Sequence, residues 1–124
     1  MDYLYNLNLN ESEILKMVDT NSCIKDMSDL EMSTYIYILV DIGCSQAQLL
    51  AIITSNPNYF SRSEDDIKRI LERLLSLENV DIPSILVNKP DILSIDVSLL
   101  EDYFKNNSNL SAQELLEKFI KDCF

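Results

Sequence analysis

The amino-acid sequence predicts an all-α fold, a stack of about seven short helices in three helical hairpin repeats plus a closing helix. The chain of 124 residues has one glycine and three prolines, which leaves little turn chemistry for β-hairpins. One pattern, an apolar helix end followed by proline, an apolar pair and serine, occurs at Ile52–Ser61 and again at Ile85–Ser94. The offset of 33 residues is typical of a helical hairpin repeat. We expect a single domain over residues 1–124.

Helix starts are predicted by side chains that can cap a first turn. Three pairs form capping boxes, Asn10 with Glu13, Ser28 with Glu31 and Ser45 with Gln48. They predict helices over about 11–20, from 29 to the region of Gly43, and from 46 to the proline at position 57. Four further caps each predict a helix. These are a long charged helix over about 64–78, a short helix that ends before position 90, a helix that passes through Phe104, and a final helix at the end of the given sequence. These caps are Ser63, Asp81, Asp96 and Ser111.

Residues 1–9 precede the first cap and alternate apolar and polar side chains, in the order Tyr3-Leu4-Tyr5-Asn6-Leu7-Asn8-Leu9. This alternation is typical of an edge strand or an extended arm. Such an arm would either cover the open end of the first hairpin or act as a docking or dimerising segment.

The proline is followed by apolar residues at steps of three, ten and seventeen. From Pro57 these residues are Phe60, Ile67 and Leu74, and from Pro90 they are Leu93 and Leu100, with Asn107 departing from the pattern. This spacing resembles the helical repeat of the mitochondrial transcription termination factor (mTERF) family. The resemblance implies a stack of short helices that curves into a half-superhelix and binds nucleic acid on a basic concave face.

The charge of this chain favours a partner other than nucleic acid. Ten basic and twenty-one acidic residues give a formal net charge of −11. Nucleic-acid binders gain affinity when Lys and Arg displace counterions, and anionic membrane surfaces attract basic segments. We therefore expect a protein partner, possibly a basic one, and neither nucleic acid nor a membrane.

Enzymatic chemistry has no support in the sequence. The chain has no histidine, which removes Ser-His-Asp and Cys-His pairs and the usual zinc ligand sets. One glycine cannot build a phosphate-binding loop. Cys23, Cys44 and Cys123 form no C-x-x-C pair and are predicted to be reduced thiols. We predict no enzyme, no catalytic residue, no cofactor and no metal, and a cytoplasmic location because no signal peptide or membrane span is apparent.

Two charged surfaces are candidate binding sites. The basic cluster is a potential phosphate-binding strip, although Glu64, Asp65, Asp66 and Glu72 could neutralise it within the same helix; its members are Arg62, Lys68, Arg69 and Arg73. Acidic residues gather near the predicted loops, where stacked repeats could align them into a ridge that imitates a nucleic-acid backbone. The strongest candidates for this acidic ridge are Asp91, Asp96, Glu101 and Asp102.

The sequence thus favours a non-enzymatic protein-interaction or regulatory module. Two alternatives stay open. One is an acidic inhibitor that mimics nucleic acid and occupies a basic nucleic-acid-binding protein through the acidic ridge. The other is an mTERF-like nucleic-acid binder that uses the basic cluster. The oligomeric state is left open.

Overall fold

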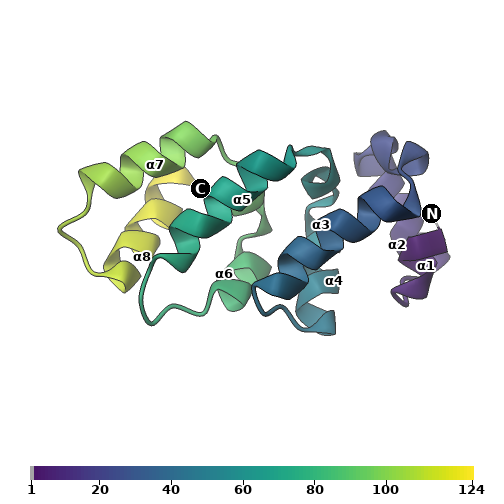
Figure 1. Ribbon diagram of the computed structural model, residues 1–124, viewed down its shortest axis with the longest axis horizontal. Coiled ribbons are helices and arrows are strands. Elements are labelled where there is room, and N and C mark those ends of the chain that lie inside the picture. Colours follow the sequence, from purple (N-terminus) through teal and green to yellow (C-terminus); the bar gives the residue numbers. More distant parts are fainter. Residues whose placement is uncertain (1) are drawn as a thin grey trace.

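A computed structural model describes residues 2–124, and within them it contains helices and no strand (Figure 1). The α-helices are α1 (Asp2–Asn6), α2 (Glu11–Thr20), α3 (Asp29–Asp41), α4 (Gln46–Ser55), α5 (Glu64–Leu75), α6 (Ile82–Asn88), α7 (Val97–Asn106) and α8 (Ala112–Cys123). Three 3-10 helices lie between them, η1 (Ser22–Asp26), η2 (Pro57–Ser61) and η3 (Pro90–Ser94). The all-α prediction is confirmed, and the seven expected helices correspond to α2 through α8.

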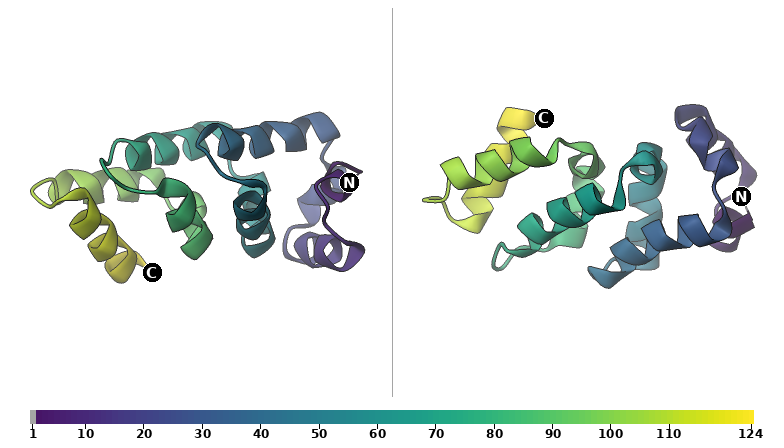
Figure 2. Two further views of the ribbon diagram at one scale, coloured as in Figure 1. Left: turned by 90° about the horizontal axis from the view of Figure 1, so that it is seen from below. Right: turned by 45° about the horizontal axis from the view of Figure 1, so that its top comes forward.

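The helices form two rows (Figure 2). Helices α3, α5 and α7 follow one another in one row, while α2, α4, α6 and α8 make the other. Direct contacts join α5 to α7 in the first row and α4 to α6 in the second. Each hairpin buries its apolar stripes against its neighbours, which is how a repeat stack builds one continuous core.

Every predicted N-cap is in place. Asn10, Ser28 and Ser45 each form a complete capping box, with the N3 side chain bonded back to the cap. Gly43 ends α3 with φ of +99°, the left-handed conformation that glycine adopts without steric cost. Helix α5 is three residues shorter than predicted, because Ser76 bonds back to the Arg73 carbonyl and the chain turns at Asn79, whose φ is +59°.

Burial follows the repeat. Equivalent positions Ile24, Tyr59 and Ile92, one in each 3-10 helix, are all completely buried. Met32, Ile67 and Leu100, one in each helix of the first row, are also completely buried. The predicted apolar steps therefore fall on the core, and the 3-10 helices that begin at Pro57 and Pro90 are part of the repeat rather than loops.

Two buried asparagines connect neighbouring repeats by the same pair of hydrogen bonds. Asn21 donates through Nδ2 to the Pro57 carbonyl (3.1 Å) and the Ser61 hydroxyl (2.7 Å). Asn56 donates to the Pro90 carbonyl (3.0 Å) and the Ser94 hydroxyl (2.9 Å). Each asparagine is the C-cap of a second-row helix, and only 6% and 4% of their surfaces are exposed. These asparagine clamps fix how one hairpin sits on the next.

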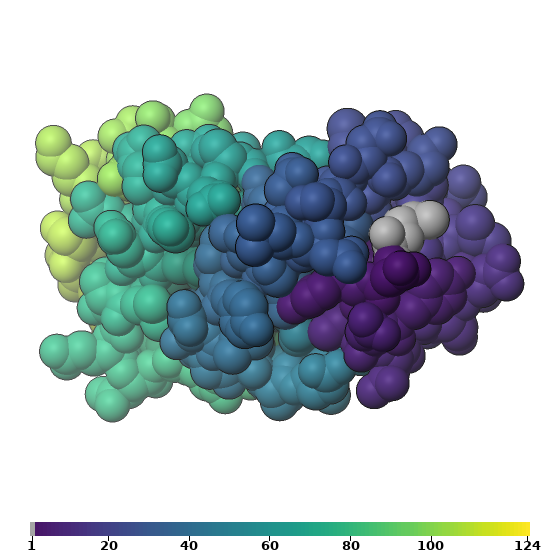
Figure 3. Space-filling view, turned by 45° about the vertical axis from the view of Figure 1, so that its right-hand side comes forward, coloured from purple at the N-terminus to yellow at the C-terminus, as the bar shows by residue number. Residues whose placement is uncertain are grey.

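The prediction of an extended arm over residues 1–9 is wrong for the residues that the structure describes. Met1 lies outside the described residues. Asp2–Asn6 form α1, which packs against α3 (Figure 3). Leu4 is completely buried, and Leu7, three residues later, packs beside the core. An isolated strand would find no edge to pair with in this fold, whereas one helical turn places both leucines on the same face.

We predict that Asn56→Ala lowers the free energy of unfolding by about 1–3 kcal/mol, because the partly buried Pro90 carbonyl loses its donor across the repeat boundary. Urea denaturation measures the change. The control is Asn58→Ala in η2, the 3-10 helix that follows Asn56; the Asn58 side chain is exposed and makes no hydrogen bond within the described residues. That variant should stay within about 0.5 kcal/mol of the wild type. Equal losses in both variants would contradict the role of the clamp.

Candidate binding surface

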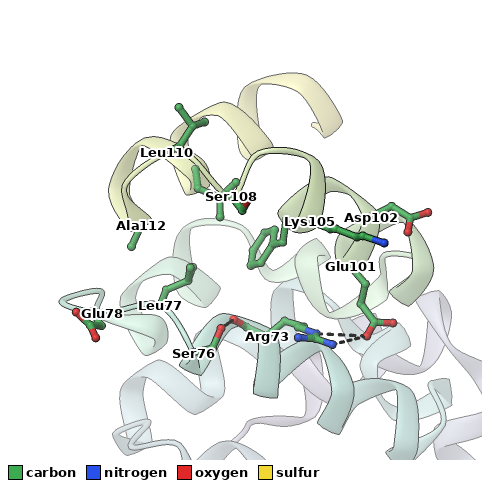
Figure 4. Close-up of a pocket in the computed structure, with 12 residues that line it drawn as sticks. Arg73, Ser76, Leu77, Glu78, Glu101, Asp102, Lys105, Ser108, Leu110 and Ala112 are labelled. Atoms are coloured by element: carbon green, nitrogen blue, oxygen red, sulfur yellow. Dashed lines mark hydrogen bonds and ion pairs between the residues drawn. The ribbon is translucent and has the colours of Figure 1, made fainter.

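A groove of about 630 Å³ is lined by the end of α5, the chain that follows it, α7 and the start of α8 (Figure 4). It brings together members of both charged sets, Arg73 from the basic cluster with Glu101 and Asp102 from the acidic ridge. The remaining lining residues are Ser76, Leu77, Glu78, Phe104, Lys105, Ser108, Leu110, Ala112 and Leu115.

Glu101 lies on α7 and binds two arginines of α5. Arg73 donates to Glu101 Oε2 from Nη2 (3.2 Å) and from Nε (3.3 Å), and Arg69 donates to Oε1. Partial burial by itself would raise the pKa of the Glu101 carboxyl. The hydrogen bonds and positive charges of Arg73 and Arg69 outweigh that effect and hold this pKa below its usual range.

The other two members of the basic cluster also contact the protein's own acceptors. Lys68 pairs with Glu64 one turn earlier on α5, at 3.8 Å. Arg62 donates from Nη2 to the Ile95 carbonyl (2.6 Å), which joins the ends of η2 and η3. The Arg62 Nε is buried and has no hydrogen-bond partner within the described residues.

Pairing within one helix, which the sequence suggested for the whole basic cluster, therefore holds only for Lys68. It is wrong for Arg69 and Arg73, which pair with the neighbouring helix. The repeat in the sequence could have predicted this contact between helices. The offset of 33 residues makes α7 the repeat equivalent of α5 and places the two side by side, so that Arg69 and Arg73 lie near Glu101.

The four acidic candidates have different surroundings. Glu101 is neutralised by the arginines, and exposed Asp96 caps α7 by accepting from the Leu99 amide (3.1 Å). Asp91, in the first turn of η3, and Asp102, on α7, are exposed and form no ion pair within residues 2–124. The structure brings Glu101 and Asp102 to the groove, whereas Asp91 and Asp96 are not among its lining residues.

The groove is lined by both apolar and charged side chains. Leu77, Phe104 and Leu110 are partly exposed, and Leu115 is buried. Sequence reasoning missed these apolar residues as a group, because they come from α7, α8 and two connecting segments. Such a mixture suits binding and offers no catalytic constellation. In residues 2–124 no three His, Cys, Asp or Glu side chains gather as metal ligands, and no helix there is long and apolar enough to cross a membrane.

Comparison with known proteins identifies one family. The family model described as mTERF matches residues 1–115, which confirms the resemblance seen in the proline-centred repeat. Neither the curated proteins nor the solved structures give a significant match to the chain.

We predict that the ion pairs of Glu101 contribute to stability in a pH-dependent way. Because the folded-state pKa of Glu101 is lowered, this contribution is present above the ordinary carboxyl pKa of about 4.3 and is lost as the pH falls through the lowered value. The urea midpoint of Glu101→Gln should lie below that of the wild type at neutral pH, and the two should converge in acid.

The matched control is Glu72→Gln, because Glu72 is exposed on α5 and forms no ion pair within the described residues. Its midpoint should differ little from that of the wild type at neutral pH. A neutral-pH difference for Glu101→Gln that persists unchanged in acid would show that the charge of Glu101 is not responsible.

Proposed function

The chain belongs to the mTERF family, and we propose that it works as a non-enzymatic binding module whose partner is a protein rather than a nucleic acid. The observation that carries this proposal is the use of the basic cluster. Arg69 and Arg73 bind Glu101, Lys68 pairs with Glu64, and Arg62 donates to a backbone carbonyl. A nucleic-acid binder instead presents Lys and Arg to phosphates. The net charge of −11 adds long-range repulsion of a polyanion.

The same charge supports a basic protein as the partner. Acidic surfaces accelerate the approach of basic proteins and disfavour acidic partners by like-charge repulsion. Asp91 and Asp102 are exposed and unpaired within the described residues, so they can interact with cations of a partner. An acidic inhibitor that occupies a nucleic-acid-binding protein is one form of this function.

Nucleic-acid binding is the second candidate, and family membership favours it. Ion pairs between exposed side chains contribute only about 0–1 kcal/mol. About half of the Arg69 and Arg73 side-chain surface is exposed, 51% and 54%. A phosphate could therefore replace Glu101 as their partner. In that case the binding residues would be Arg62, Lys68, Arg69 and Arg73.

An affinity pull-down from native cell extract at low and moderate salt, with and without nuclease, separates the two candidates. We expect a basic protein whose recovery does not depend on nuclease and falls as salt rises. The recovered protein is then purified and titrated against the purified chain, because capture alone does not establish direct binding. Recovery of nucleic acid, or of proteins that nuclease treatment removes, would contradict the proposal.

Charge variants test the surface in the same titration. Asp91→Asn with Asp102→Asn should weaken binding by about threefold to tenfold, because each lost charge removes up to about 1 kcal/mol of attraction. The control, Glu11→Gln with Asp19→Asn on α2, changes the net charge equally at exposed positions in the first hairpin. Equal losses in both variants would show that total charge, and not these two aspartates, decides the affinity.

A further inference from the structure

We infer that the groove between α5, α7 and α8 binds a single basic amphipathic helix of the partner protein. This inference rests on the proposed function and extends it, because it names the binding site and the kind of segment that occupies it. Three properties of the groove carry the inference: its apolar lining residues, the lack of a strand edge within residues 2–124, and the excess of acidic over basic lining residues.

The apolar lining gives an apolar side chain a place to bury. Leu77 and Phe104 pack against the core and keep part of their surface exposed, while Leu110 lies on the loop before α8, outside the core cluster. The volume of about 630 Å³ lies within the range of roughly 300–1,000 Å³ that is usual for ligand pockets. It can therefore hold a few side chains, the number that one face of a short helix presents.

A helix is the conformation that suits this site. A bound peptide whose backbone leaves water must satisfy its N–H and C=O groups. An extended peptide does so by pairing with an exposed strand edge, and residues 2–124 contain no strand. A helix satisfies these groups within itself and places apolar residues at helical spacing into a groove.

The lining of the groove has a small excess of negative charge, which favours positive charge on the occupant. Its ionisable residues are three acidic ones, Glu78, Glu101 and Asp102, and two basic ones, Arg73 and Lys105, and Arg73 is paired with Glu101. Glu78 and Asp102 lie on different elements, the chain after α5 and α7 itself, so lysines or arginines on both flanks of a bound helix can reach them (Figure 4). A second copy of this chain is disfavoured as the occupant, because each copy carries a net charge of −11.

The test uses a synthetic helical peptide of leucine and lysine whose leucines repeat at helical spacing. Chemical-shift changes in the 15N-labelled protein locate the site, and fluorescence anisotropy gives the affinity. We expect shifts centred on Leu77, Asp102 and Leu110. A peptide of the same composition in scrambled order, and one with glutamate replacing lysine, should bind at least about tenfold more weakly.

Groove variants sharpen the test. Leu110→Ser removes an apolar contact outside the core, and Glu78→Lys with Asp102→Lys reverses the charge of two acidic lining residues. Each should weaken the leucine–lysine peptide by at least about tenfold, equivalent to about 1.4 kcal/mol. Two controls make the same chemical changes on exposed positions of α2: Leu15→Ser, and Glu11→Lys with Asp19→Lys. They should stay within about twofold of the wild type.

No peptide binding, shifts that lie outside the groove, equal affinity for the scrambled peptide, or unaffected groove variants would each overturn the inference. The pull-down keeps this failure separate from failure of the proposed function. A partner that binds the groove variants as tightly as the wild type would leave the protein-binding function standing and reject the groove. Absence of any directly binding protein would reject the function itself.

Discussion

The hydrogen bonds of the two asparagine clamps set the register on which the rest of the stack depends. Asn21 and Asn56 each end a second-row helix and reach across the repeat boundary to the proline carbonyl and the serine hydroxyl of the next 3-10 helix. Hydrophobic burial supplies most of the stability but has no direction. A buried amide that must satisfy its N–H groups has direction, so it selects one placement of each hairpin on the next.

This register determines the electrostatics of the surface. It places α7 beside α5, where Glu101 meets Arg69 and Arg73, and it places η3 beside η2, where Arg62 reaches the Ile95 carbonyl. Three of the four side chains of the basic cluster, Arg62, Arg69 and Arg73, are thereby used between repeats. The acidic side chains Glu78, Asp91 and Asp102 remain exposed and unpaired within the described residues. This distribution of charge is the basis on which we propose a basic protein as the partner.

Local signals in the sequence predicted the helices well, because caps and prolines act over one turn. Asn10, Ser28 and Ser45 specify their helix starts through their own side chains, and the proline spacing marked the core positions. Features that depend on packing were not predictable in the same way. Residues 2–6 alternate like a strand but become α1 because Leu4 can bury against α3. The groove required Leu77, Phe104 and Leu110 to meet from separate segments, and the clamps required both sides of a repeat boundary.

We propose that internal pairing of Arg62, Lys68, Arg69 and Arg73 leaves no nucleic-acid surface at the basic cluster. The most direct test of this claim is a titration of labelled single-stranded RNA and duplex DNA of random sequence with the purified chain at low salt, read by fluorescence anisotropy. We predict no binding at protein concentrations up to about 100 μM, where non-specific nucleic-acid binders with dissociation constants of roughly 1–100 μM bind clearly. A measurable affinity whose logarithm falls linearly with the logarithm of salt concentration, and that Lys68→Gln with Arg69→Gln abolishes, would contradict the claim.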